Sequence, residues 1–358
     1  MGGPEKLDKV RRQGRLDARA RIAALLDGGT FTELGLLAGS ADVPADAFVA
    51  GSGTIDGRPV LVGAEDFTVA GGSIGVAAAT KRARLAELAR RELCPLVLFL
   101  EGAGHRATNQ LVAHRPAPND LQAMVELAGL VPTAAVVTGP SAGHGALAAP
   151  LSDLTVMVRG DAALFTAGPP LVKAAIGEVI DKEQLGGADV HAGTSGIAQL
   201  AVDDQREAVT AVRRWLGLLP SSAWQRPPVV ADAPGPRLLE RMLDIVPPTD
   251  RQPYDMRLVV EELVDPESYL ELSPDHGRSL LTGLARMQGQ PVAVVANQPS
   301  VLAGAIDVAA AEKGARFVER TTAFHLPLLQ LADNPGVLAG SASERAGILR
   351  AGARFFAA

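Results

Sequence analysis

The chain has 358 residues, enough for two domains with complete cores, and a formal net charge of −6. The negative charge argues against general nucleic-acid binding, and a single cysteine, Cys94, excludes both a disulfide framework and a cysteine-based zinc site. The N-terminus is charged and polar, and no apolar run is long enough to cross a membrane. We therefore expect a cytoplasmic protein that binds neither nucleic acid, membrane nor metal.

The first half of the chain alternates between helical and strand-like patterns. Apolar residues recur with a loosely helical period over residues 5–26, where Gly14 allows two short helices in place of one. An Asp56-Gly57 pair between two apolar runs predicts a hairpin. Further strands are expected at residues 31–34, 96–100 and 132–138, helices at 76–92 and 121–130, and loops at 67–75 and 107–119. Strands that alternate with helices are typical of the α/β class.

Residues 139–149 are small and follow the last of these strands. We interpret them as a loop that turns into a helix. Glycine would let a ligand approach the backbone, and the free N–H groups of the first helical turn would face a developing negative charge. Such donors form an oxyanion hole, for example for a thioester enolate. A glycine-rich turn that only packs a strand against a helix is the simpler alternative, and this stretch alone favours it.

The chain also repeats itself at a constant shift. Residues 57–60 match residues 289–292, and 289 − 57 = 232. Lys81 meets Lys313 at the same shift. Two copies of one fold are therefore predicted.

The repeat sets the expected domains. Residues 1–220 form the first domain, a proline-rich linker covers 221–253, and residues 254–358 begin the second. The counterpart of residues 139–146 would fall near 371–378, beyond the last residue of the sequence. We therefore expect a second domain that is incomplete in this chain. Either the chain is a fragment of a longer one, which is the favoured interpretation, or the second site is degenerate.

Several motifs resemble one enzyme family, the carboxyltransferase (β) subunits of biotin-dependent acyl-CoA carboxylases of the acetyl- and propionyl-CoA type. The motifs are residues 66–75 (Asp-Phe-Thr-Val-Ala-Gly-Gly-Ser-Ile-Gly), 153–160, 166–169, 183–188 and 295–299. The resemblance implies two tandem crotonase-like (ClpP/crotonase) ββα-spiral domains. In the family, the N-terminal domain holds acyl-CoA and the C-terminal domain holds carboxybiotin.

The resemblance also implies a function. The chain would move a carboxyl group from carboxybiotin to the α-carbon of an acyl-CoA through backbone oxyanion holes, without a catalytic histidine, cysteine or metal. No methionine here is followed by lysine, so the usual biotinylation motif is absent, and biotin would arrive on a separate biotinylated α subunit or carrier. A homo- or hetero-hexamer is implied. The alternatives are a non-catalytic paralogous subunit and a crotonase-class acyl-CoA decarboxylase or hydratase.

Site residues follow from the matched motifs. The backbone oxyanion hole is assigned to Gly143 and His144. Residues expected to contact acyl-CoA are Gly71, Gly72, Ala103, Gly104, Arg106, Ala142 and Gly145. On the biotin side we expect Asn297 and Gly336.

Some residues depart from the family pattern or stay open. His144 stands where the family usually has glycine, and it is either a pocket-lining residue or a structural hydrogen-bonding residue. His105 has the same alternatives, with the structural one favoured. A catalytic-base role for either is less favoured, because the cofactor can supply the base. Lys81, Arg82 and Arg84 are further candidates for the CoA phosphates, although a solvated helix face is the simpler interpretation of the two arginines.

Overall fold

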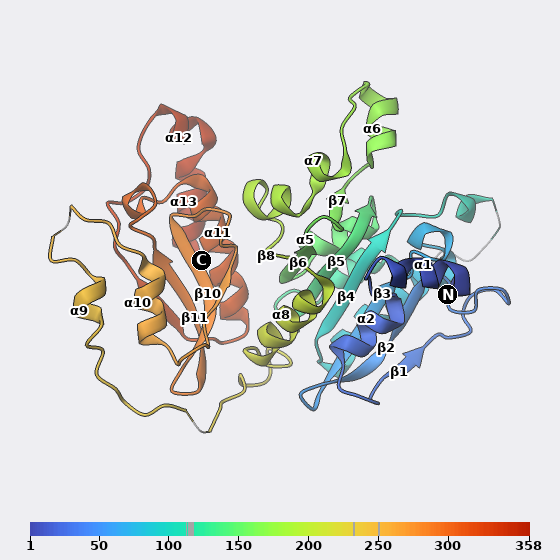
Figure 1. Ribbon diagram of the computed structural model, residues 1–358, viewed down its shortest axis with the longest axis horizontal. Helices are drawn as coiled ribbons and strands as arrows, with labels where there is room; N and C mark the ends of the chain where they lie inside the picture. Colours follow the sequence, from blue (N-terminus) through green and yellow to red (C-terminus); the bar gives the residue numbers. More distant parts are fainter. Residues whose placement is uncertain (112, 114–117, 232, 250) are drawn as a thin grey trace. The chain divides into compact units, whose positions relative to one another are not determined.

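The computed structural model describes residues 1–111, 113, 118–231, 233–249 and 251–358. Parts of the predicted loop at 107–119 and of the predicted linker at 221–253 lie outside the described residues. The chain forms two compact units (Figure 1): Met1–His191 with Leu200–Arg213, and Ala192–Gln199 with Arg214–Ala358. None of the described helices is long and apolar enough to cross a membrane.

The first unit is built on a mixed sheet. Its strands are β1 (Thr32–Leu34), β2 (Phe48–Ile55), β3 (Arg58–Glu65), β4 (Leu96–Gly102), β5 (Thr133–Ala142), β6 (Leu154–Val158), β7 (Ala163–Phe165) and β8 (Leu200–Val202). The order is β1-β2-β3-β4-β5-β6-β8, and β7 pairs with β5. Strands β1 to β3 are antiparallel and those from β3 to β8 are parallel. Parallel strands are covered on both faces, which explains why β4 is fully buried and apolar from Leu96 to Leu100.

Helices and short helical turns connect these strands. The helices are α1 (Pro4–Arg12), α2 (Ala18–Leu25), α3 (Val76–Glu92), α4 (Asp120–Val125), α5 (Ala148–Leu151), α6 (Pro169–Ile176), α7 (Lys182–Gly186) and α8 (Gln205–Gly217). Single 3₁₀ or π turns lie at Ala70–Gly72, Ala107–Gln110, Gly145–Leu147 and Val190–Thr194. Gly14, with φ of 73°, separates α1 from α2, so the two-helix alternative is correct. Figure 1 shows α6 and α7 on an extension that leaves the sheet after β7.

The second unit has a smaller sheet. Its strands are β9 (Leu270–Leu272), β10 (Leu280–Met287), β11 (Gln290–Asn297) and β12 (Leu328–Leu331), in the order β12-β11-β10-β9. Its helices are α9 (Met242–Ile245), α10 (Met256–Leu263), α11 (Val308–Ala323), α12 (Ser341–Ala346) and α13 (Ile348–Ala357), with a 3₁₀ turn at Leu302–Gly304. Its core packs apolar side chains of α10 against β10 and β11, among them Val260, Leu281 and Val294.

The repeat predicted from the sequence is present in the structure. Strands β10 and β11 begin 232 residues after β2 and β3, since 280 − 48 and 290 − 58 both equal 232. Both hairpin turns are held by an aspartate before the hairpin. Asp27 accepts hydrogen bonds from the N–H groups of Asp56 and Gly57, and Asp265 accepts them from Gln288 and Gly289. The two units therefore share one local design.

The structure corrects two predicted elements. Residues 139–142 are not loop, because β5 continues to Ala142 through its pairing with β7. A Cβ atom added at Gly139 would lie 2.5 Å from Oε1 of Glu101, so this glycine makes room for a buried carboxylate and not for a ligand. The helix predicted at 121–130 ends at Val125 and is followed by turns, where Gly129 has a φ of 69°.

Candidate active site

Three glycine-containing loops follow neighbouring parallel strands, and we call them the glycine loops: residues 70–75 after β3, 102–106 after β4, and 142–145 at the end of β5. Carboxyl ends of parallel strands meet at one edge of a sheet, where ligands of α/β proteins commonly bind. The N–H of Ala103 donates to the carbonyl of Gly71 at 3.0 Å. The structure therefore brings together the residues predicted to contact acyl-CoA.

Glycine is required at two positions in these loops. A Cβ atom at Gly72 would lie 2.2 Å from the carbonyl oxygen of Glu101, and one at Gly104 would lie 2.8 Å from that of Ala142. Both residues also have left-handed backbones, with φ of 67° and 76°. The loops approach one another backbone to backbone, which leaves no space for side chains between them.

A helical segment begins at His144. His144 has φ −54° and ψ −45°, and helical angles continue at Leu147 and Ala148 into α5. The N–H groups at a helix start have no acceptor within the helix, so those of His144 and Gly145 need an acceptor from outside it, such as a ligand. The backbone donor predicted at His144 fits this geometry.

Gly143 requires a correction. Its N–H donates to the carbonyl of Phe165 at 3.0 Å, which extends the pairing of β5 with β7. That N–H was predicted to be an oxyanion donor, and in this structure it is already engaged. An added Cβ at Gly143 would lie 3.7 Å from its nearest neighbour, so lack of space does not require glycine here. Glycine is needed because the backbone has a φ of 58°, which other residues disfavour.

Beneath the glycine loops lies a fully buried charge cluster. The Arg82 guanidinium contacts Glu65 Oε1 at 2.8 Å and Asp120 Oδ2 at 2.6 Å, and all three side chains are at most 4% exposed. Burial raises the pKa of Glu65 despite the charge of Arg82. A Cβ atom at Gly145 would lie 3.1 Å from Glu65 Oε1, so this carboxylate supports the third loop directly.

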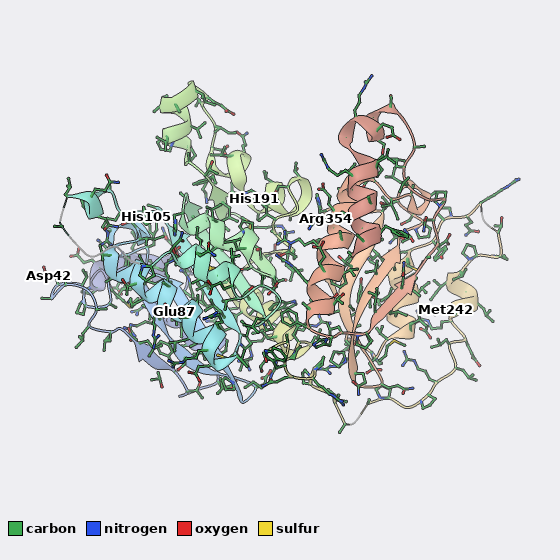
Figure 2. The ribbon with its side chains drawn as sticks, turned by 180° about the vertical axis from the view of Figure 1, so that it is seen from behind. Asp42, Glu87, His105, His191, Met242 and Arg354 are labelled. Atoms are coloured by element: carbon green, nitrogen blue, oxygen red, sulfur yellow. The ribbon has the colours of Figure 1, made fainter. Side chains whose placement is uncertain are left out.

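The cluster extends to two histidines. Asp120 Oδ1 and His144 Nε2 are 2.5 Å apart, and the His105 ring packs edge-on against the His144 ring with centroids 4.5 Å apart. Burial alone would raise the pKa of Asp120, but the hydrogen bond with His144 and the charge of Arg82 outweigh it and lower that pKa to about 2. Burial and the neighbouring His144 lower the pKa of His105, which is labelled in Figure 2.

A second set of charges ties the N-terminal segment to the sheet. Glu101 accepts hydrogen bonds from Arg21 at 2.5 Å and from Arg15 at 2.7 Å. The N–H of Glu101 in turn donates to Glu65 Oε2 at 2.6 Å. The N-terminal segment therefore fixes the carboxylates under the glycine loops, although it contributes no predicted site residue.

Arg106 lines a cavity of about 510 Å³ in the first unit. Its guanidinium pairs with Asp46 at 2.7 Å and donates to the Ser73 carbonyl at 2.9 Å, with 24% of the side chain exposed. The other residues that line the cavity include Ala38, Ser40, Val43, Val76, Ala77, Thr80 and Asn109. The cavity reaches the first turn of α3.

The two neighbours Lys81 and Arg82 do not lie on a solvated helix face. Lys81 is buried and donates to the carbonyls of Ala45 and Phe48, and burial lowers its pKa to about 8. Arg82 is the centre of the buried cluster. Arg84 does lie on the surface, where it pairs with Glu87, which is labelled in Figure 2.

In the second unit the predicted biotin-side residues lie together. Asn297 donates to the carbonyl of Gly304 at 3.1 Å and accepts from Asn334 at 2.8 Å, and Asn334 also accepts from the N–H of Gly336. Asn297 occupies the position equivalent to Glu65, since 297 − 65 = 232. Its side chain joins two loops, whereas Glu65 in the first unit joins α3 to β4 through Arg82 and the N–H of Glu101.

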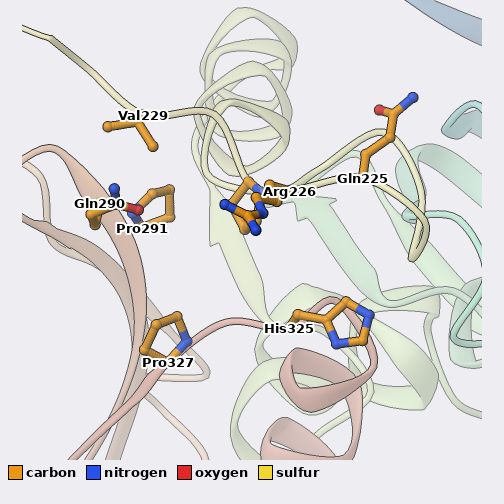
Figure 3. Close-up of a pocket in the computed structure, with 8 residues that line it drawn as sticks. Gln225, Arg226, Val229, Gln290, Pro291, His325 and Pro327 are labelled. Carbon is orange, nitrogen blue, oxygen red and sulfur yellow. The ribbon is translucent and has the colours of Figure 1, made fainter.

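A cavity of about 400 Å³ in the second unit contains none of the predicted site residues (Figure 3). Pro227, Pro291 and Pro327 form part of its wall, and Arg226 and His325 are its basic residues. Over the described residues, no group of three or more histidine, cysteine, aspartate and glutamate side chains is placed to hold a metal ion.

Sequence reasoning missed Glu65, Asp120 and the central role of Arg82. These residues are separated by 17 and 38 positions, and no local pattern joins them. The repeat gave no signal for them either, because the loop at 142–145 that Glu65 and Asp120 contact has no matching segment in the sequence.

The carboxyl transferase domain family matches residues 9–358. The chain is 34% identical to the propionyl-CoA carboxylase carboxyltransferase subunit of Haloferax mediterranei, covering 99% of this chain and 70% of that protein. It is also 34% identical to the methylmalonyl-CoA decarboxylase subunit alpha of Veillonella parvula, with 99% and 71% covered.

Among solved structures, the transcarboxylase 12S hexamer with methylmalonyl-coenzyme A bound superposes with a TM-score of 0.92, at 35% identity over 99% of this chain and 71% of that one. The predicted fold class, two tandem crotonase-like α/β domains, is thereby confirmed. The chain belongs to the carboxyl transferase domain family.

Proposed function

We propose that this chain is the carboxyltransferase of a biotin-dependent acyl-CoA carboxylase and moves a carboxyl group from carboxybiotin to the α-carbon of an acyl-CoA. The observation that carries the proposal is the helix start at His144, enclosed by the glycine loops. Family membership and relatives that act on propionyl-CoA and methylmalonyl-CoA support it.

The chemistry follows from the backbone. When the α-carbon of a thioester loses its proton, negative charge develops on the thioester oxygen. The N–H groups of His144 and Gly145 would donate to that oxygen, and such a donor contributes about 3–4 kcal/mol to transition-state stabilisation. Gly71, Gly72, Ala103, Gly104 and Ala142 would let the acyl group lie against the main chain.

The cavity beside Arg106 is the proposed site for the CoA portion. Its walls include the first turn of α3, a 17-residue helix whose N-terminal N–H groups favour an anion. The Asp46 carboxylate now fills this role, because it accepts a hydrogen bond from the N–H of Ala78 at 3.2 Å and pairs with Arg106 at 2.7 Å. A phosphate would take the place of Asp46 at Arg106 and at the helix start, with the thioester directed to the glycine loops. Arg106 is connected to them directly, because its N–H donates to the carbonyl of Ile74 at 3.0 Å.

The second unit is proposed to hold biotin delivered by a separate biotinylated α subunit or carrier. An added Cβ at Gly336, whose φ is 115°, would have no atom within 4 Å, so the backbone there is open to a planar group. When bound, carboxybiotin would supply the carboxyl group. Asn297 would keep the loops that carry Gly304 and Gly336 in place. A homo- or hetero-hexamer is proposed from the hexamer named for transcarboxylase 12S.

Two measurements on the full chain test this function. Titration calorimetry with CoA, acetyl-CoA and propionyl-CoA should give heat and a dissociation constant for at least one thioester. Carboxyl transfer from free carboxybiotin to the bound thioester should then be detected by mass spectrometry. A folded chain that binds none of the three compounds would refute acyl-CoA binding, and binding without any transfer would favour a non-catalytic subunit.

A further inference from the structure

The His144 side chain carries a feature that the backbone mechanism leaves unused. His144 Nε2 lies 2.5 Å from Asp120 Oδ1, and its side chain remains 22% exposed. The ring therefore spans the distance from a buried carboxylate to the accessible side of the loop. No partner of Nδ1 is found among the described residues.

Asp120 is held in the ionised form. Arg82 Nε contacts its other oxygen at 2.6 Å, and the carboxylate is 4% exposed. A carboxylate accepts hydrogen bonds only, so His144 Nε2 must carry a hydrogen to make this contact. In a neutral imidazole the other nitrogen, Nδ1, is then the unprotonated one. The Asp120 contact therefore leaves Nδ1 as the basic nitrogen of the ring.

The position of the ring follows from the backbone. The same residue supplies the N–H proposed to bind the thioester oxygen, so a thioester held there would lie beside the residue that carries the ring. His105 on the neighbouring glycine loop packs against the ring edge and limits its rotation. Asp120, His105 and, behind Asp120, Arg82 are the titratable groups around His144.

We propose that Nδ1 of His144 is a general base that removes the α-proton of a bound acyl-CoA, and that the chain therefore exchanges α-hydrogens of acyl-CoA with solvent in the absence of biotin. This inference rests on the proposed function. The α C–H bond breaks, its electron pair becomes the enolate, and the proton passes to Nδ1. The imidazolium exchanges that proton with water and returns one to the α-carbon, so the thioester is regenerated and no oxidant or reductant is needed.

The test uses the full chain in D₂O with acetyl-CoA or propionyl-CoA and no biotin, and deuterium in the recovered thioester is measured by mass spectrometry. The wild type should incorporate deuterium faster than the same mixture without protein. His144→Gln keeps a donor to Asp120 but has no basic nitrogen, and exchange should fall by at least about a hundredfold. His144→Ala should lose exchange to the same extent.

Three further variants separate a base from a structural residue. His325→Ala, in the second unit, should exchange at the wild-type rate. Asp120→Glu retains the carboxylate, whereas Asp120→Asn removes it and should lower the apparent pKa in the pH profile of exchange. An unchanged profile in a folded Asp120→Asn variant would show that Asp120 does not position the base.

Acyl-CoA binding is measured on every sample by calorimetry. Wild type that binds acyl-CoA without catalysing exchange would overturn the inference and leave the proposed function intact. Exchange that survives in His144→Gln but is lost in His105→Ala would show that His105 is the base, and it would overturn the inference. Absence of binding would instead refute the proposed function itself.

Discussion

Lys81 and Lys313 occupy equivalent positions in the two copies of the repeat, since 313 − 81 = 232. Each lies on the long helix after the hairpin, and each side chain is buried and donates to two backbone carbonyls. Lys81 contacts Ala45 and Phe48, and Lys313 contacts Ser273 at 3.0 Å and His276 at 2.7 Å. Burial lowers both pKa values, to about 8 and about 7. In both units a buried amine therefore joins the helix to the chain just before the hairpin or at its first residue.

Replacing Lys313 with methionine should change how stability depends on pH. In the unfolded chain this amine keeps its proton up to its ordinary pKa of 10.5, whereas in the folded chain it loses the proton near pH 7. Between these values the unfolded state binds more protons, so Lys313 makes the free energy of unfolding rise with pH, by at most about 1.4 kcal/mol per pH unit.

Urea unfolding of wild type and Lys313→Met at pH 7.5 and 9.5 measures this effect. The stability of the wild type relative to the variant should increase at the higher pH. For the control substitution of the exposed Lys9, Lys9→Met, the stability difference from wild type should be the same at both pH values. If the stability difference between wild type and Lys313→Met is the same at pH 7.5 and 9.5, the lowered pKa of Lys313 is contradicted.

Gly104→Ala should disrupt acyl-CoA binding. The added Cβ would lie 2.8 Å from the Ala142 carbonyl and would push two glycine loops apart, in addition to straining a backbone with φ of 76°. Gly57→Ala is the matched control, because its φ is 72° but no atom lies within 4 Å of the added Cβ. In both variants the left-handed backbone should lower the free energy of unfolding by about 1 kcal/mol. A loss of acyl-CoA affinity, measured by calorimetry, is expected for Gly104→Ala alone.

His144→Pro isolates the backbone donor. Proline suits the first helical position and the φ of −54°, but it has no N–H. His144→Ala keeps the N–H and should retain carboxyl transfer within about tenfold of wild type, because the transferring cofactor can supply a base. His144→Pro should be slower than His144→Ala by a further 10²–10³-fold, on the order expected for one oxyanion donor. Equal transfer rates in the two folded variants, checked by circular dichroism, would refute a donor at residue 144.

Gly143→Val should nearly abolish carboxyl transfer while the fold is retained. Its backbone lies at φ 58°, which a β-branched residue strongly disfavours, and a shift there would move the helix start at His144. Transfer from free carboxybiotin is the measurement, with circular dichroism as the folding control. A folded, active Gly143→Val enzyme would show that the loop tolerates the change.

Arg82→Met should destabilise the first unit strongly. The substitution leaves Glu65 and Asp120 buried without their shared counter-charge, and removing one partner from a buried ion pair costs about 3–5 kcal/mol. Arg84→Met, two positions along α3, removes an exposed pair with Glu87 and should cost less than about 1 kcal/mol. Chemical denaturation measures both. Similar costs for the two variants would mean that the buried cluster contributes no more than a surface pair.

The elements predicted correctly are those whose signal is local. The Asp56-Gly57 turn has positive φ at both residues, as its sequence requires, and the helix at Val76–Glu92 has the predicted bounds. The repeat was also visible without the structure, because identical residues recur at a fixed shift. Family motifs in the sequence supplied the activity and the glycine positions.

The tertiary structure alone decided which polar groups meet. Arg82 and Arg84 look alike in the sequence, yet packing of α3 against the sheet buries one and exposes the other. The contact of Asp120 with His144 joins residues 24 positions apart, and the N–H of Gly143 is taken by Phe165 because β7 pairs with β5. Periodicity and turn chemistry act within a few residues. Hydrogen bonds between distant segments form only once the strands have fixed their neighbours, so the sequence indicated where the loops lie and the fold determined which atoms they present.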